Sequence, residues 1–269
     1  MKKRILSALL CVMLIISLCA CGGGNRRLSG YEVVAKLNDE QFTVAFRSGD
    51  PLCDIVSAAM KEMAAEGLPG RLSSQYLGAD YSCVESYAGA MSELSANGVD
   101  MQRGRRFIVG VQGGAAPLCW KNDSGSFTGL IPDMISELAR KTDWDVVYSE
   151  IKVEDVEIEL ASGNIDCAWI PAEMPQSETL SLSPPWMNNS HLVVVRQGGG
   201  LNRLKDLKKH NVGITDQTGE NALKNSDEKV YAAVTIWSYA DIRTCFNALA
   251  SGECDAIIID NIVSINYIN

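Results

Sequence analysis

Histidine, paired cysteines and long apolar runs are scarce or missing among these 269 residues, and each shortage excludes a class of protein. The only histidines are His191 and His210, and no two cysteines form a Cys-x-x-Cys pair, which argues against a zinc site. The apolar runs are too short to cross a membrane as a helix. The Gly-x-Ser-x-Gly, His-Glu-x-x-His and P-loop patterns are absent, so we expect no enzyme activity, no metal and no cofactor.

Positive charge is also in short supply. The chain holds 24 Lys and Arg against 33 Asp and Glu, a net charge of −9, and three of the positive residues lie at positions 2–4. A chain this acidic has no broad electrostatic attraction for phosphate backbones, so we expect no nucleic-acid partner. The 46% hydrophobic and 21% charged residues are ordinary for a globular protein and exclude wholesale disorder.

The first thirty residues have the pattern of an export and anchoring segment. Residues 2–4 are basic and residues 5–18 are almost entirely apolar, as in a secretory signal peptide. The following Leu-Cys-Ala-Cys run resembles a bacterial lipoprotein box that ends at Cys21. We expect a signal peptide over 1–20, a lipid anchor at Cys21, a flexible tether over 21–30 and a location outside the cytoplasm on a membrane. A secreted protein cut nearby, without the lipid, is the alternative.

Six cysteines follow the anchor position, and their pairing cannot be derived from the sequence. Six thiols allow 15 pairings, so a disulfide framework stays possible. Cys167 lies within the apolar run IDCAWI, which favours a buried thiol. The full set is Cys53, Cys83, Cys119, Cys167, Cys245 and Cys254.

Strand and helix spacing alternate along the rest of the chain. Strands are expected at residues 31–37, 42–46, 107–111, 146–151, 165–170, 191–196, 212–215, 230–236 and 256–260. Helices are expected at residues 50–67, 72–77, 131–140, 156–161, 201–208, 241–250 and 261–268. This alternation predicts α/β layers with largely parallel sheets. Residues 80–104 lack apolar periodicity and indicate a linker, and the glycines at 198–200 indicate a pivot.

Several stretches with consistent spacing carry a resemblance to one family. They are FIVGVQGGAAPLCW, FTGLIPDMISELARKT, ELASGNIDCAW, LSPPWMNNSHLVVVR, LKDLKKHNVGITDQTGENAL and ALASGECDAIIIDNIVSINYI. Residues 105–269 thereby resemble the first three quarters of the amino-acid-type (family 3) solute-binding proteins of ABC importers. Residues 31–80 resemble that family's last quarter. The tail precedes the head, so we interpret the chain as a circular permutant; a damaged tandem pair of half-domains is the alternative.

The resemblance implies a type II periplasmic-binding-protein fold, with two α/β lobes joined by two hinge crossings. Lobe 1 would comprise residues 41–80 and 105–194. Lobe 2 would comprise residues 198–269, with 30–38 returning as its last strand. Residues 81–104 would join the family's usual termini, and the new termini would lie together on lobe 2.

The resemblance also implies a solute site between the lobes, from which this chain departs. The family binds an α-amino acid with an Asp for the ammonium, which Asp260 matches, and an Arg for the carboxylate, which nothing matches. In the corresponding run after Ile170, Gln176 or Glu178 occupies the Arg position and Glu173 replaces a Thr. Exchanging a cation for acids favours a cationic or neutral solute, whereas a Glu173 that points to solvent would change nothing.

The remaining candidates line the two walls of this expected site. The family's stacking aromatic falls at Ala115 and its acidic neighbour at Gln112, so Trp120 is the aromatic that would substitute, unless it is a core residue. Thr215, Thr218 and Gly219 match a loop at a helix N-terminus whose N–H groups could receive a carboxylate. The predicted ligand-binding set is therefore Gln112, Ala115, Trp120, Ile170, Glu173, Gln176, Thr215, Thr218, Gly219 and Asp260.

Two functions follow as expectations. The first is a lipid-anchored protein that captures a small polar solute, an amino acid or a related amine, and delivers it to an ABC permease. The second is a degenerate sensory or partner-binding module of the same fold that binds no amino acid.

Overall fold

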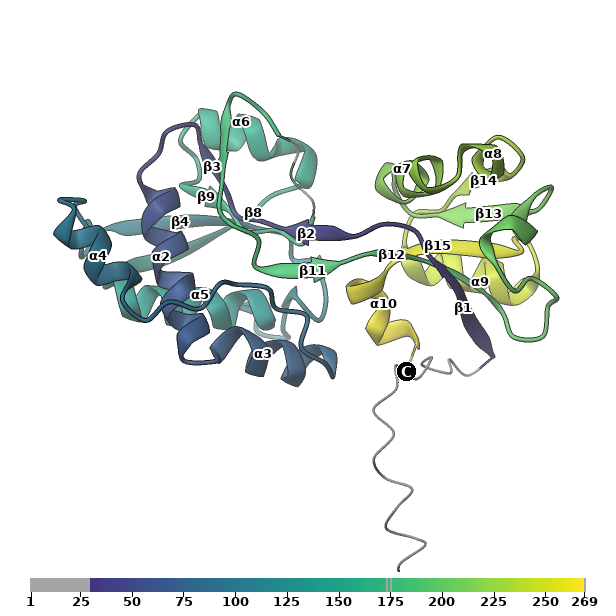
Figure 1. Cartoon of the computed structure of the whole chain (residues 1–269), viewed down its shortest axis with the longest axis horizontal. Coiled ribbons are helices and arrows are strands. Elements are labelled where there is room, and N and C mark those ends of the chain that lie inside the picture. Colours follow the sequence, from purple (N-terminus) through teal and green to yellow (C-terminus); the bar gives the residue numbers. More distant parts are fainter. Residues whose placement is uncertain (1–29, 173, 175, 269) are drawn as a thin grey trace, which may run out of the picture.

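Two five-stranded sheets, each covered by helices on both faces, form two lobes joined by a short two-stranded ribbon (Figure 1). The computed structural model describes residues 30–268 apart from 173 and 175. The predicted signal peptide, the predicted lipid anchor at Cys21 and the last residue, Asn269, lie outside these residues. No helix among them is long and apolar enough to cross a membrane. The expected α/β architecture with two lobes is confirmed.

The sheet of the first lobe has the order β10-β3-β9-β4-β8. Its strands are β10 (Leu180–Leu182), β3 (Ala45–Arg47), β9 (Cys167–Ala168), β4 (Arg106–Val111) and β8 (Asp145–Glu150). The helices of this lobe are α2 (Leu52–Ala65), α3 (Leu68–Leu77), α4 (Ala90–Ala96), α5 (Leu130–Thr142) and α6 (Val156–Ala161), with a 3-10 turn at Val153–Asp155. One face of the sheet packs on α2, α3 and α5, and the other packs on α6.

The sheet of the second lobe has the order β1-β12-β15-β13-β14. Its strands are β1 (Tyr31–Lys36), β12 (His191–Arg196), β15 (Ala256–Asp260), β13 (Asn211–Ile214) and β14 (Thr235–Ser238). The helices are α7 (Gln217–Ser226), α8 (Glu228–Tyr231), α9 (Ile242–Ser251) and α10 (Asn261–Ile268), with a 3-10 turn at Leu204–Leu207. Helices α7 and α8 cover one face and α9 covers the other.

Both sheets are mixed, whereas the sequence predicted largely parallel sheets. In the first lobe, β4 is parallel to β8 and β9, but β3 is antiparallel to β9 and β10. In the second lobe, β13 is parallel to β14 and β15, but β12 is antiparallel to β15 and β1. The chain passes from β1 in the second lobe to β3 in the first lobe, and it returns from β10 to β12. Because these two passages run in opposite directions, β1 pairs antiparallel with β12, and β3 pairs antiparallel with β10.

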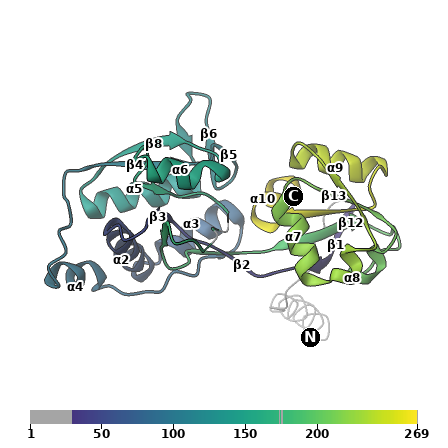
Figure 2. The same ribbon diagram turned by 90° about the horizontal axis from the view of Figure 1, so that it is seen from above.

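The connection between the lobes is the ribbon of β2 (Glu40–Phe42) and β11 (Met187–Asn189), which pair antiparallel (Figures 1 and 2). The expected pivot at glycines 198–200 is wrong, because these residues form a turn after β12, beyond the end of the strand that is distant from the ribbon. The expected boundary of lobe 1 at residue 194 falls inside β12, which pairs with β1 and β15 along its length. The single strand expected at 42–46 is divided between β2 and β3.

One predicted strand is a helix in part. Residues 230–236 are apolar enough to read as a strand, but Asp227 accepts hydrogen bonds from the N–H groups of Lys229 and Val230 and starts α8. Val230 is buried as a helical residue, and the strand begins only at Thr235.

The core of the first lobe extends through the ribbon into α10. Trp186 is buried between Trp169 and Phe42, with ring centroids 5.9 and 6.1 Å away. Ile262 and Ile265 of α10 join the same cluster although β15, which precedes them, lies in the second lobe. Helix α10 is therefore a third connection between the lobes, and both figures draw it between them (Figures 1 and 2).

The linker and the cysteines complete the fold. Residues 81–104 lie along the first lobe, with α4 packed on α2, and Trp144 Nε1 donates to the carbonyl of Met101 at 3.1 Å.

The six described cysteines are free thiols, four of them buried, so the structure contains no disulfide within its described part.

Candidate functional site

Three strand ends of the second lobe meet at the edge next to the ribbon. Strands β13 and β15 are parallel, so their last residues, Ile214 and Asp260, lie at the same edge. Strand β12 is antiparallel to β15, and its first residue, His191, is the register partner of Asp260. Opposite residues of an antiparallel pair place their side chains on one face of the sheet. The edge therefore brings together residues that are far apart in the sequence.

Helix α7 begins at this edge with an acidic cap. Asp216 Oδ1 accepts hydrogen bonds from the N–H groups of Thr218 (2.9 Å) and Gly219 (3.1 Å), and from the Thr218 hydroxyl. Burial raises the pKa of Asp216, but these hydrogen bonds and the charge of His191 bring it below its usual value. The two N–H groups that the sequence offered to a solute carboxylate are therefore already bound to a carboxylate of the protein.

Four polar side chains lie where the ribbon enters the second lobe, and we name them the hinge cluster: Asn38, Glu40, Asn189 and His191. The last three are at most 7% exposed. Glu40 Oε1 lies 2.7 Å from His191 Nδ1 and accepts a hydrogen bond from Asn38 Nδ2 at 2.6 Å. Glu40 Oε2 accepts one from Asn189 Nδ2 at 3.0 Å. The buried carboxylate is thus surrounded by one imidazole and two amides.

The hinge cluster contacts two of the predicted solute-binding residues. Asn189 Nδ2, which reaches Glu40, also donates to Asp260 Oδ2 at 2.5 Å. His191 Nε2 lies 3.3 Å from Thr218 Oγ1. Burial lowers the pKa of His191, but Glu40, then Asp260 and Asp216, raise it above its usual value. Burial raises the pKa of Glu40, but His191 and the two amides bring it below its usual value. The pair therefore favours its charged form.

The candidates of the first lobe surround a small hairpin. Strand β5 (Gly114–Ala115) pairs with β6 (Cys119–Lys121), which continues to β7 (Phe127–Thr128). Ala115 is buried, and Gln112 and Trp120 are half-buried. The Trp120 ring meets the edge of the Tyr76 ring from α3, with centroids 6.3 Å apart. Tyr76 and Gly129 thus explain part of the Trp120 burial, and its contact with a solute stays a prediction.

Gly129 allows the hairpin to lie against α5. It has a φ of +122°, and a Cβ atom there would lie 2.6 Å from the carbonyl oxygen of Leu118 and 2.7 Å from Trp120 Cζ3. Only glycine fits this approach without a shift of backbone. Helix α5 begins at the next residue, so Gly129 fixes the position of Trp120 relative to the helix.

The segment that replaces the family's Arg is only partly described. Glu173 lies outside the described residues. The Ile170 side chain is fully buried in the core beneath α6, and its carbonyl accepts a hydrogen bond from the Ala172 N–H at 2.9 Å. Gln176 is exposed. The buried Ile170 side chain serves the core, and the roles predicted for Gln176 and Glu173 stay predictions.

The hinge cluster is not among the residues predicted from the sequence. Glu40 and Asn189 lie 149 residues apart, and nothing in either segment points to the other. A signal existed in the polar runs at 38–40 and 188–191, because each interrupts an apolar strand pattern at a lobe boundary. A histidine that opens an otherwise apolar strand needs a polar partner if it is buried.

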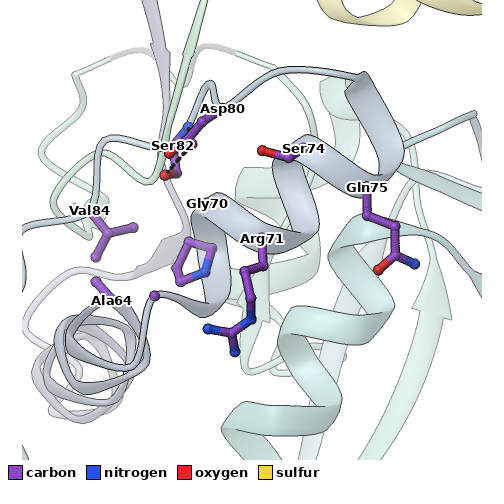
Figure 3. Close-up of a pocket in the computed structure, with 10 residues that line it drawn as sticks. Ala64, Gly70, Arg71, Ser74, Gln75, Asp80, Ser82 and Val84 are labelled. Atoms are coloured by element: carbon purple, nitrogen blue, oxygen red, sulfur yellow. Dashed lines mark hydrogen bonds between the residues drawn. The ribbon is translucent and has the colours of Figure 1, made fainter.

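A separate surface depression of about 720 Å³ lies beside α3 on the first lobe (Figure 3). Arg71 and Gln75 come from α3, and Asp80 and Ser82 come from the segment that follows it (Figure 3). Asp80 Oδ1 already accepts hydrogen bonds from the N–H and the hydroxyl of Ser82 at 2.8 and 2.6 Å. The depression shares no residue with the predicted solute-binding set.

Comparison with known proteins relates the chain to solute-binding proteins. Residues 107–237 match the model of the bacterial extracellular solute-binding proteins, family 3. A probable histidine-binding protein of Campylobacter jejuni subsp. jejuni is 25% identical over 155 residues, which cover 56% of this chain and 59% of that protein. The match therefore spans less than two thirds of this curated relative.

Solved structures give the same relation. A crystal structure of Tv2483 bound to L-arginine is 26% identical, with a TM-score of 0.51, and the match covers 66% of this chain and 72% of that chain. AncCDT-1, an ancestral amino acid-binding protein described as a precursor of cyclohexadienyl dehydratase, is 20% identical with a TM-score of 0.53, covering 65% and 76%. At that identity the second likeness shows the fold alone. The two lobes have the type II periplasmic-binding-protein fold.

Proposed function

Because this chain is a homologue of the bacterial extracellular solute-binding proteins of family 3, we propose that it captures a small cationic solute between its lobes for an ABC permease. The solute class is a cationic amino acid or the amine derived from it. The observation that carries this proposal is Asp260, which ends β15 beside the ribbon and is held by Asn189. A carboxylate in that place suits the ammonium group of a solute.

The charges on the second lobe support a cation as the preferred solute. Asp216 and Asp260 lie at the same edge, and the N–H groups of Thr218 and Gly219 are bound to Asp216. The sequence holds no Lys or Arg from residue 153 to residue 195, the region in which the family places its carboxylate-binding Arg. The two relatives named for a solute, one arginine-bound and one histidine-binding, concern amino acids with basic side chains.

We also propose that the chain is a circular permutant with a lipid anchor at Cys21. The family match begins only at residue 107, after the segment that resembles the family's last quarter. In the structure, β1 completes the second lobe and β3 and α2 complete the first, so the early residues supply parts of both lobes. The proposed lobes are residues 41–80 with 105–190, and residues 30–38 with 191–269, joined through 81–104.

The alternative is a module of the same fold that binds a partner protein and no amino acid. Its support is the internal carboxylate of Asp216, which takes the N–H groups that a solute carboxylate would use. Catalysis has less support, since the family consists of binding proteins and the likeness to the dehydratase precursor shows the fold alone.

Thermal unfolding and calorimetric titration of the mature protein test the proposal. The panel pairs arginine with agmatine and histidine with histamine, because each pair differs only in the carboxylate. A solute at a hundred times its dissociation constant adds about 2.7 kcal/mol of stability. We expect stabilisation by at least one cationic member and its loss in Asp260→Asn. Cooperative unfolding without any shift would contradict solute capture and favour the partner-binding module.

A further inference from the structure

His191 lies within a group of acids that come from three different elements. Glu40 of β2 lies 2.7 Å from its Nδ1 atom. Asp260 of β15 is its register partner across the sheet. Asp216, the cap of α7, is reached through Thr218, whose hydroxyl lies 3.3 Å from His191 Nε2 and donates to Asp216 Oδ1. These three carboxylates raise the pKa of the imidazole.

The main chain and neighbours hold the imidazole in this position. The N–H of His191 donates to Asn38 Oδ1 at 2.8 Å, and its carbonyl accepts from the Leu37 N–H at 2.9 Å. A Cβ atom at Gly219 would lie only 3.7 Å from His191 Cδ2, so α7 closes one side of the ring. The side chain is 4% exposed. The ring therefore has little freedom to turn away when its charge changes.

The protonated ring matches the carboxylates around it. With both nitrogens protonated, the ring carries its charge with Nδ1 2.7 Å from Glu40 Oε1 in an ion-pair contact, and Nε2–H can donate to Thr218, whose own hydroxyl donates to Asp216. In the neutral tautomer with its proton on Nδ1, beside Glu40, the Nε2 atom is an acceptor. To donate to Nε2, the Thr218 hydroxyl would have to give up its hydrogen bond to Asp216. Deprotonation of His191 thus takes one positive charge away from the three carboxylates and costs Asp216 its hydrogen bond from the Thr218 hydroxyl.

We propose that the His191 proton and the cationic solute compete for these carboxylates, so that solute binding releases a proton and acid weakens binding. The inference rests on the proposed function, in which Asp260 receives the positive group of the solute. A solute cation at Asp260 stands next to the register partner of that residue and repels the imidazolium. By reciprocity, whatever the solute does to proton affinity the proton does to solute affinity.

The direction of the effect follows from the two protonation states. The acids raise the pKa of His191 in the solute-free protein above its usual value of 6.5. A bound cation lowers that pKa again. Between the two values the free protein carries a proton that the complex lacks, so affinity rises with pH and levels off above the pKa of the free protein. A tenfold change in affinity corresponds to about 1.4 kcal/mol of repulsion between the imidazolium and the bound cation.

The experiment measures arginine and agmatine binding to the mature protein by calorimetry from about pH 5.5 to about pH 8.5, a range that includes histidine titration. Both probes keep their cationic side chains over this range. We expect the dissociation constant to fall about tenfold as the pH rises. Heats measured in buffers of different ionisation enthalpy should show release of a fraction of one proton inside this window.

Three variants separate the role of His191 from a structural one. His191→Gln should bind with an affinity that no longer depends on pH. Glu40→Gln removes the main counter-charge, so the pH at which affinity changes should move to a lower value. His210→Gln is the matched control, because that histidine is 40% exposed beside Asp255, at the end of β13 distant from the site. It should leave the whole pH profile unchanged.

Each outcome decides between the two proposals. Affinity that is independent of pH, or that falls as the pH rises, overturns the competition while solute capture stands. A His191→Gln variant that keeps the profile of the unaltered protein also overturns it. If neither probe binds at any pH, the proposed function itself fails, and the competition fails with it.

Discussion

The Glu40→Gln variant should lose the most stability in mildly acidic solution and little in alkaline solution. Glu40 and His191 are buried and lie 2.7 Å apart. At that distance and an effective dielectric constant of about 20, their Coulomb attraction is about 6 kcal/mol, of which desolvation of the two groups removes a part. Removing one charge of a buried pair costs about 3–5 kcal/mol, because the other charge stays buried without its partner. We expect a loss of that size where both groups are ionised.

The pH range follows from the two pKa shifts. The pKa of His191 is raised in the folded protein, so its contribution is fully present below about 6.5 and is lost as the pH rises through the folded value. The pKa of Glu40 is lowered, so its contribution is present above about 4.5 and is lost as the pH falls through the folded value. The cost of Glu40→Gln should therefore be largest between about pH 4.5 and about pH 6.5.

Urea unfolding at a series of pH values measures this cost as the difference in free energy of unfolding. Glu85→Gln is the matched control, since Glu85 forms an ion pair with Lys61 while 72% exposed. Such a surface pair contributes between 0 and about 1 kcal/mol, and its loss should show no comparable maximum. A cost of Glu40→Gln that is the same at pH 6 and pH 9 would refute the assignment of a charged pair.

Three further predictions concern the fold. Gly129→Ala should lower the free energy of unfolding by about 3 kcal/mol, because its Cβ would lie 2.6 Å from the Leu118 carbonyl oxygen. Gly114→Ala is the control and should be nearly neutral, because its Cβ would have no atom within 4 Å. Urea unfolding of the two variants measures the difference. Ile262→Ala should cost about 2–5 kcal/mol in the same assay, since the side chain is fully buried in the core of the first lobe, and a neutral result would show that α10 does not connect the lobes. A thiol assay on the mature protein, unfolded without reductant, should find the six described cysteines reactive. In the folded protein Cys119 should react slowly, because burial raises its pKa to about 12. Fewer than six reactive thiols in the unfolded protein would reveal a disulfide.

Local patterns predicted the elements well where one face of the element is buried. The helix expected at 131–140 is α5 (Leu130–Thr142), and the strand expected at 256–260 is β15 (Ala256–Asp260). The prediction failed at 230–236, where an apolar run with strand composition is bent into α8 by the cap at Asp227. The cap at Asp227 is visible in the sequence, and in the fold it outweighs the strand propensity of the apolar run.

The site was predictable only where it belongs to a single segment. Asp260 could be placed at the lobe edge because it is the last residue of a single apolar strand, β15. The Glu40–His191 pair could not, since it depends on the ribbon that brings β2 beside β11. The capture of the Thr218 N–H by Asp216 could not be predicted either, because an acid at that position reads equally well as a solute ligand or as a helix cap.

Asp260 lies where the two strands of the ribbon and helix α10, the connections seen in the described part of the chain, meet the second lobe. Its carboxylate accepts from Asn189 at the end of β11, and Asn189 in turn binds Glu40 of β2. The next residue, Asn261, donates its N–H to the Ser190 carbonyl at 2.9 Å and begins α10, whose Ile262 is buried in the first lobe. A solute held by Asp260 would thus act at once on both strands of the ribbon and on α10. The same contacts explain why a charge change at His191, the register partner of Asp260, should alter solute affinity without any direct contact between imidazole and solute.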